Sequence, residues 1–423
     1  MTQVNVSSGI ANPAALADAL RDSVLAGLNL VPVAGGFLSY LGALFIPGIG
    51  KSQEQMWREY TDQAISDALF RLMQADLIGL SNVARLYGDA VRANDNNALR
   101  AQSIAANTQF AALAPRFQLA GEQVRLLPLF AICATMHLSL LRDMTLTGKE
   151  LGFNAAFIAT LNEQLANRID SYGKYVDQYV PQAIAQTRLD NPHGPALRQN
   201  QPLSAMLETK TRLQLSVIDL RDTWHAFDAE RFPGPSLVKL DREIYTPIAG
   251  WWDHHSTPDH IPEWKAPSSP LRRIDVWERA QWRTRFLSAF SVTYEDGSGL
   301  TTGDRTGTQR AVTVPAGHHI KRVQTHASAG VFRTTFTYQN DQSFSIGRDV
   351  ESSERRFSHE YLGHQLSSVR SIGKGRNAAE NAVSGCIYGF QLVNKVARPA
   401  SGETYSRLAE HMPSRLLDWV AGR

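Results

Sequence analysis

The stretch LLPLFAICATMHLSLLRD, residues 126–143, decides the fold. Between Arg125 and Arg142 the only titratable side chain that could carry a charge near neutral pH is His137. A helix formed by this stretch is apolar on every side, and such a helix has to be surrounded by protein or by lipid. Pro128 is compatible with a helix because a proline is tolerated in the first turn. We therefore expect either the centre of a helical bundle or a segment that enters a membrane.

The segments around this stretch carry apolar side chains at three- and four-residue steps, which is typical of amphipathic helices. The expected helices cover about residues 14–30, 34–46, 52–91, 98–117, 157–179 and 206–227. Six such helices pack economically when their apolar faces turn toward one apolar helix. The sequence therefore predicts a seven-helix bundle with a buried central helix over residues 1–230.

The pattern changes to β structure after the bundle. Val292-Thr293-Tyr294 and Phe336-Thr337-Tyr338 are followed at the same spacings by Leu300 and Gly303 and by Phe344 and Gly347, so the segment contains an internal repeat. Turn residues follow each triplet. Repeated hairpins of this kind predict a pseudo-symmetric all-β domain, similar to a β-prism, over residues 273–396. The fold class is therefore α+β with several domains.

Two further segments complete the predicted layout. Residues 231–272 are rich in Pro, Trp and His and show no sustained period, so we expect a linker with one short strand at 240–245. Residues 397–423 form a C-terminal tail with one helix at 402–421. The apolar run at 386–392 is expected to be the last strand of the β domain.

Charge and cysteine content exclude several classes of protein. The 423 residues contain 43 Lys or Arg and 40 Asp or Glu, a net charge of +3, which argues against a dedicated nucleic-acid binder. Residues 272–396 alone hold 17 basic and 11 acidic side chains. This basic excess fits either a solvated face or an affinity for anionic surfaces. Two cysteines, Cys133 and Cys386, cannot form a disulfide framework, and residues 1–12 do not have the pattern of a signal peptide.

Motifs that carry catalysis or metal binding are missing from the sequence. There is no HExxH, GxSxG or CxxC motif. Gly48–Ser52 lacks the first glycine of a phosphate loop, because Phe45 occupies that position. His254, His255 and His260 lie in the Pro-rich linker without the spacing of zinc ligands. We therefore expect no enzyme activity, no cofactor and no metal.

Three blocks resemble the three-domain Cry insecticidal δ-endotoxins. LLPLFAICATMHLSLLRDMTLTGKELGF is similar to the central-helix block of that family, and LIGLSNVARLYGDAV is similar to the end of its third helix. LQLSVIDLRDTWHAFDAERFP followed by LDREIYTPI resembles its seventh helix and the strand that leaves the bundle. The order is kept over about residues 30–248. The resemblance implies a seven-helix bundle whose helix-four/helix-five hairpin inserts into the membrane of gut cells.

Carried over to this chain, the hairpin covers about residues 98–147 with its turn at 118–124. Candidate residues of the inserting hairpin are Asn107, Phe110, Arg116, Gly121, Leu127, Phe130, Cys133, His137 and Leu141. Candidate bundle-stabilising residues are Arg142, Asp143, Asp219 and Arg242. Exposed hairpin tips commonly carry recognition, and the candidate receptor loops are Glu295, Asp296, Gly297, Asn340 and Asp341.

The chain after residue 248 is too short for both β domains of a three-domain toxin. The layout resembles instead the B subunit of the Pir-type binary insecticidal toxins, which implies a separate small A-type subunit. It also implies a target-cell membrane, a protein or glycan receptor, and an oligomer in the pore state. The expected place of synthesis is the bacterial cytoplasm, and the expected place of action is the host-cell membrane.

The sequence leaves two alternatives open. The first is a β-prism lectin-like binding protein on a helical scaffold that forms no pore. The GxxxD loop of jacalin-type sugar sites is not found near the last strands, so lectin activity is not implied. The second alternative is a chain that binds an A-type partner and is inert by itself.

Overall fold

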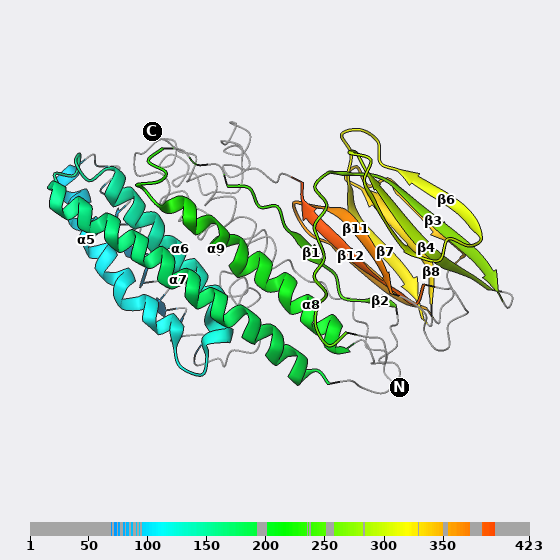
Figure 1. Cartoon of the computed structure of the whole chain (residues 1–423). Coiled ribbons are helices and arrows are strands. Elements are labelled where there is room, and N and C mark those ends of the chain that lie inside the picture. The colour runs from blue at the N-terminus through cyan, green and yellow to red at the C-terminus, as the bar shows by residue number, and fades with distance from the viewer. Residues whose placement is uncertain are drawn as a thin grey trace. The chain divides into compact units, whose positions relative to one another are not determined.

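The computed structural model (Figure 1) describes residues 95–192, 201–250 without 235 and 237, 258–281, 284–328, 330–349, 354–372 and 383–393. It also describes scattered positions between 69 and 93, most of them in helical conformation. The helices predicted at 14–30, 34–46 and 402–421 lie outside the described residues. The seven-helix count therefore stays a prediction.

The chain divides into two compact units. The first comprises Met1–Val180, Leu215–Lys239 and Val396–Arg423, and the second comprises Pro181–Gln214 and Leu240–Lys395. The boundaries predicted at 230, 272 and 396 remain predictions. Each unit has its own dominant secondary structure: helices in the described part of the first, and antiparallel strands, with some helical residues, in the described part of the second.

The described helical elements of the first unit comprise a helical hairpin and the helices around it. Their bounds are α5 (Asn96–Leu113), η1 (Ala114–Gln118), α6 (Gln123–Leu146), α7 (Ala155–Asp190), α9 (Asp219–Thr223) and η4 (Trp224–Phe227), and α7 continues past Val180 into the second unit. Asp95 caps α5, because its carboxylate accepts hydrogen bonds from the first backbone N–H groups of the helix. Pro115 occupies the first turn of the 3-10 segment η1.

Helix α6 is the centre of the first unit. Every residue from Leu126 to Thr145 is buried, so the prediction of a helix buried on all sides is confirmed. The buried set includes polar side chains such as His137, Arg142 and Asp143. A buried polar group costs free energy unless it is hydrogen-bonded, so the partners of these side chains decide how α6 is held.

The helix expected over 206–227 is not one regular α-helix. It begins earlier, as α8 (Gln201–Leu213), passes through the π-helical segment η3 (Gln214–Ile218) and continues as α9 and η4. The apolar period predicted the buried face correctly, but π-helical segments carry no such signal in sequence. In the second unit, α8 packs on β strands through Leu203, Met206 and Leu207.

Three four-stranded antiparallel sheets form the rest of the second unit. The first contains β1 (Glu243–Tyr245), β12 (Gly385–Leu392) and β11 (His364–Ile372), with β2 (Ala249–Gly250) also on β12. The second has the order β10 (Arg355–Glu360), β7 (Ile320–Ala327), β8 (Val331–Tyr338) and β9 (Ser343–Gly347). The third has the order β5 (Gly299–Gly303), β4 (Thr284–Tyr294), β3 (Leu271–Gln281) and β6 (Thr308–Thr313).

Each sheet contacts the other two, through β11 with β4, β5 and β7 and through β4 with β8. A β-prism requires contacts of this kind, although the prism itself stays a prediction. The short strand expected at 240–245 is β1. Both β1 and β2 fall inside the range predicted as a linker, and both pair with β12, so this segment contributes to a sheet.

The internal repeat of the sequence is a repeat of structure. Hairpin β4–β5 pairs Ala289 with Gly303, and hairpin β8–β9 pairs Arg333 with Gly347. Both glycines have positive φ, +85° and +117°. A Cβ at either position would collide with a carbonyl of the partner strand, so each position requires glycine. The constant offset in sequence therefore reflects two equivalent hairpins.

Candidate functional site

The candidate site is the hairpin made by α5, η1 and α6. Gly121 forms the turn with a φ of +85°, and its backbone N–H donates to the Gln123 side chain over 2.9 Å. At about 1.5 Å per residue, the 24 residues of α6 span roughly 36 Å, more than the ~30 Å of a hydrocarbon core. Within the described residues, α6 is the helix long and apolar enough to cross a membrane, a test that a buried core helix also passes.

His137 lies near the middle of α6 and joins the two arms of the hairpin. Its Nε2 is 2.9 Å from Asn107 Oδ1 on α5, and its Nδ1 is 2.8 Å from the Tyr172 hydroxyl on α7. The ring stacks on Phe110 with a centroid distance of 5.6 Å. Burial, and then the nearby Arg168 cation, lower the pKa of His137 to about 3. The imidazole is therefore neutral: Nε2–H donates to the Asn107 oxygen, which can only accept, and Nδ1 accepts from Tyr172.

Arg142 binds the C-terminal end of α6 to the segment that leaves the bundle. Its guanidinium donates to the carbonyls of Ala226 and Phe227 over 3.2 and 3.3 Å and to that of Gly234 over 2.9 Å. Two of these carbonyls lie at the end of η4, where backbone acceptors have no partner in the helix. Burial lowers the pKa of Arg142, while Asp143 and Asp228 oppose that shift. A second contact joins η4 to α6: the Trp224 indole N–H donates to the Thr135 hydroxyl over 2.8 Å.

Several hydroxyl groups of α6 are satisfied within the helix itself. Thr135 donates to the Ala131 carbonyl over 2.7 Å, and Thr145 donates to the Leu141 carbonyl over 2.8 Å. A hydroxyl that donates to the carbonyl four residues earlier needs no partner outside its helix. These groups would therefore remain hydrogen-bonded if α6 changed its surroundings.

The remaining hairpin candidates take different places. Leu127, Cys133 and Leu141 are buried in α6, and Phe130 packs against the rings of Tyr172 and Tyr175. Arg116 on η1 forms an ion pair with Asp76 over 2.9 Å. Burial raises the pKa of the Cys133 thiol well above its ordinary range, so the thiol stays protonated and is a poor nucleophile.

The four candidate bundle-stabilising residues do not all lie in the helical unit. Arg142, Asp143 and Asp219 are buried there. Arg242 belongs to the second unit, where its guanidinium is 2.7 Å from His364 Nε2 at the start of β11. The resemblance alone assigned Arg242 to the bundle, whereas its contact joins the approach to β1 with β11.

The candidate receptor loops are the tips of the two equivalent hairpins, and their residues are exposed. Asp296 accepts hydrogen bonds from the Ser298 backbone and hydroxyl, which lower the pKa of its carboxyl. Lys321 lies 2.7 Å from the Asp341 carboxylate and lowers its pKa in the same direction. Both carboxylates are therefore ionised and engaged locally, and the receptor role of these loops stays a prediction.

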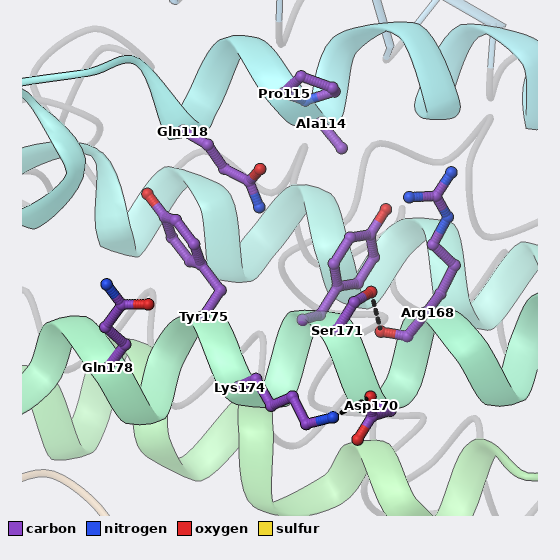
Figure 2. Close-up of a pocket in the computed structure, with 10 residues that line it drawn as sticks. Ala114, Pro115, Gln118, Arg168, Asp170, Ser171, Lys174, Tyr175 and Gln178 are labelled. Carbon is purple, nitrogen blue, oxygen red and sulfur yellow. Dashed lines mark hydrogen bonds and ion pairs between the residues drawn. The ribbon is translucent and has the colours of Figure 1, made fainter.

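A pocket that the sequence did not reveal lies between η1 and α7 (Figure 2). Its volume is about 380 Å³. The lining residues are Ala114, Pro115, Gln118, Arg168, Asp170, Ser171, Tyr172, Lys174, Tyr175 and Gln178. The helical period places Tyr172, Val176 and Tyr179 in the core but gives no indication that the polar residues between them meet η1. Within the described residues, no group of three or more His, Cys, Asp or Glu side chains could hold a metal ion, and His254 and His255 lie outside those residues.

Comparison with known proteins agrees with this geometry. A family model described as delta endotoxin, N-terminal domain, matches residues 23–228. Pesticidal crystal protein Cry1Id of Bacillus thuringiensis is 29% identical over 236 residues, 52% of this chain and 31% of that protein. Cry1Aa of Bacillus thuringiensis subsp. sotto is 29% identical over 235 residues, 52% of this chain and 24% of that protein. The matched region thus spans about a third or less of the length of these relatives.

Solved structures share the fold at lower identity. The structure titled PirB has a TM-score of 0.71 and 16% identity, covering 90% of this chain and 96% of that one. The Bacillus thuringiensis insecticidal crystal protein Cry7Ca1 has a TM-score of 0.73 and 18% identity, covering 90% of this chain and 75% of that one. Residues 23–228 therefore match the delta endotoxin N-terminal domain, within a fold that resembles PirB.

Proposed function

We propose that the chain is a subunit of a pore-forming insecticidal toxin and that its α5–α6 hairpin inserts into the membrane of target gut cells. The observation that carries the proposal is the division of the hairpin's polar contacts into two sets. One set closes inside the hairpin and would survive insertion. The other set ties the hairpin to the rest of the first unit and would have to break.

The inner set lowers the cost of placing α6 in lipid. His137 sits near the middle of the helix, where an ionisable group is expensive unless it has a partner. The Asn107 oxygen on α5 supplies that partner over 2.9 Å, so the two helices can enter together as a pair. The backbone of α6 is hydrogen-bonded within the helix, as a bilayer requires.

The outer set holds the closed form. It contains the contacts of Arg142 with the carbonyls at 226, 227 and 234, of Thr135 with Trp224, and of His137 with Tyr172. Arg142 and Asp143 lie near the C-terminal end of α6, where long charged side chains can reach an interface by snorkelling. Insertion would break these contacts and, within the described residues, also the Arg116–Asp76 ion pair.

For the second unit we propose binding to a protein or glycan receptor, together with a separate small A-type subunit and an oligomeric pore. The support is the fold shared with PirB over 96% of that chain and the exposed tips of the two equivalent hairpins. Synthesis in the bacterial cytoplasm and action at the host-cell membrane belong to the same proposal.

The test is dye release from vesicles by a protein whose hairpin can be locked and released. Gln118 on η1 and Gln178 on α7 line the same pocket, so Gln118→Cys and Gln178→Cys can be joined by a bifunctional methanethiosulfonate reagent. The native thiols will not interfere, because burial raises the pKa of both Cys133 and Cys386, the latter to about 12.

The expected result is that the cross-linked protein releases no dye and that reduction restores release. The single variant Gln118→Cys, treated in the same way, should leak like the unmodified protein. Equal leakage from the locked and reduced forms contradicts insertion of the hairpin. Selective binding on a glycan array without any leakage would favour the lectin-like alternative, for which the repeated hairpins are the supporting observation.

A further inference from the structure

The pocket between η1 and α7 has no role in the insertion of the hairpin. One of its walls belongs to the hairpin, which would insert, and the other belongs to α7, which lies outside the hairpin. Pro115 and Gln118 lie on η1, which is part of the hairpin, whereas Arg168, Tyr175 and Gln178 lie on α7 (Figure 2). A molecule bound here would touch both walls at once. The pocket is therefore a place where a ligand could hold the hairpin against α7.

Arg168 gives the pocket a positive charge that no described residue neutralises by an ion pair. Its guanidinium makes no hydrogen bond or ion pair with the described residues, and its one ring contact is with the face of Tyr172 at 5.7 Å. Lys174, by contrast, is neutralised by Asp170 on the next turn, over 2.7 Å. Figure 2 shows Lys174 and Asp170 directed away from η1, while Arg168 points toward it. The charge that faces the pocket is thus that of one guanidinium, which pairs well with a carboxylate.

Tyr175 adds a polar group that lacks a hydrogen-bond partner among the described residues. Its hydroxyl oxygen is buried and has no hydrogen-bond partner in the described part of the chain. Burial raises the pKa of Tyr175, so the hydroxyl keeps its proton and remains a donor. A buried polar group without a partner is unfavourable. An oxygen atom of a ligand would recover part of this cost.

The other lining groups suit a small ring that bears hydroxyls. Gln118 and Gln178 present amide groups that both donate and accept, and Pro115 presents an apolar ring face. The volume of about 380 Å³ lies near the lower end of the range of small-molecule pockets, about 300–1,000 Å³. That size admits one sugar unit.

We propose that this pocket binds an acidic monosaccharide unit, with its carboxylate on Arg168 and a hydroxyl on Tyr175, and that the bound sugar holds η1 against α7. The binding and the holding of η1 concern the closed protein alone. Only the consequence, a slower release of the hairpin, rests on the proposed function. A free uronate and the uronate of a glycan chain offer the same chemistry to the pocket.

The first arm of the test titrates the full chain with sodium glucuronate and follows binding by isothermal calorimetry. Sodium acetate carries the charge without the ring, and methyl glucoside carries the ring without the charge. Glucuronate should bind at least tenfold more tightly than either. Arg168→Gln should abolish this preference. Arg188→Gln, which removes a cation from the same helix outside the pocket, should keep it.

The second arm follows amide hydrogen exchange. Saturating glucuronate should slow exchange in η1 and the adjoining turn, and Arg168→Gln should remove the protection. No saturable binding, equal affinity for the three probes, or an equal effect of Arg188→Gln would overturn the site. Binding without protection of η1 would overturn the holding role. Neither readout involves a membrane, so failure of the pore proposal is measured separately by dye release.

Discussion

Helix α6 of the first unit and strand β12 of the second are both buried almost throughout, but their backbone hydrogen bonds lie in different places. Those of α6 close within the helix. Those of β12 run to β1, β2 and β11. A buried backbone group without a partner is costly. Helix α6 can therefore leave its surroundings with its backbone satisfied, whereas β12 cannot move without dismantling a sheet.

The polar side chains show the same contrast. In the sheet, Glu243 accepts hydrogen bonds from Ser367, Ser368 and Tyr245, and all four side chains belong to the second unit. In the helical unit, side-chain contacts of Arg142, Thr135 and His137 join α6 to described elements outside the hairpin. Strand β12 is thus hydrogen-bonded to its neighbours through its backbone, whereas the described polar contacts of α6 with elements outside the hairpin are made by side chains.

The largest loss of unfolding free energy is expected when the hydrogen bonds of Arg142 are removed. Arg142→Ala leaves three backbone carbonyls without their donor, and the loss in unfolding free energy should be about 3 kcal/mol or more. Urea unfolding followed by helical circular dichroism measures it. The control is Arg125→Ala, which removes an exposed arginine paired with Glu122 and should change stability by no more than about 0.5 kcal/mol. Equal losses of unfolding free energy in the two variants would show that the hydrogen bonds of Arg142 do not stabilise the bundle.

The sheet should tolerate even a single added methyl group poorly. A Cβ on Gly389 of β12 would meet the Glu243 carboxylate and the Ser368 hydroxyl, so Gly389→Ala should cost about 1–3 kcal/mol. Gly173→Ala is the matched control on α7, because apart from the backbone of its own helix no described atom lies within 4 Å of the added Cβ. For Gly173→Ala we expect the unfolding free energy to rise by about 0.5–1 kcal/mol, because alanine has the higher helix propensity. Thermal unfolding of both variants checks the pair, and a stabilising Gly389→Ala would contradict the rigid packing of β12.

A smaller effect is expected from the pH dependence of the closed bundle. Because the pKa of His137 is lowered to about 3 in the fold, the unfolded chain binds a proton that the folded chain does not. This contribution to stability is fully present above the ordinary histidine pKa of about 6.5 and is lost as the pH falls toward 3. Between pH 7 and 5.5 the loss should be about 1 kcal/mol.

His137→Gln isolates this contribution from the other titrating groups. His359 and His326 also have lowered pKa values and should affect the wild type and the variant equally. Urea titrations at the two pH values should therefore show a smaller decrease in the variant. The same decrease in both proteins would contradict the neutral, buried imidazole.

The sequence predicted α6 well because an all-apolar helix leaves a direct signal in composition. The repeat of β4–β5 and β8–β9 was equally visible, because the last residue of both β5 and β9 has a positive φ and has to be glycine. The partners of Arg142 were not visible, since they are backbone carbonyls at 226, 227 and 234 and any residue type supplies a carbonyl. The charge of Glu243 gave no indication that it would be buried, because two of its hydroxyl partners, Ser367 and Ser368, lie more than 120 residues away.

The pocket at Arg168 was missed for a related reason. Periodicity assigns a residue to the inner or outer side of its own helix, but it does not say which neighbour stands opposite. Tyr175 lies between the core positions Tyr172 and Val176, and only the fold brings it to η1. Sites made by side chains from two helices become visible when the packing is known.

The central claim, that α6 leaves the bundle while β12 stays in its sheet, is tested most directly by labelling from within the bilayer. The full-length protein is added to dye-loaded vesicles that contain a photoreactive diazirine phospholipid, and labelled peptides are mapped by mass spectrometry. We predict that peptides of α6 (Gln123–Leu146) carry the label as dye is released, while peptides of β12 (Gly385–Leu392) remain unlabelled. Dye release without label on α6, or equal labelling of α6 and β12, would contradict the account.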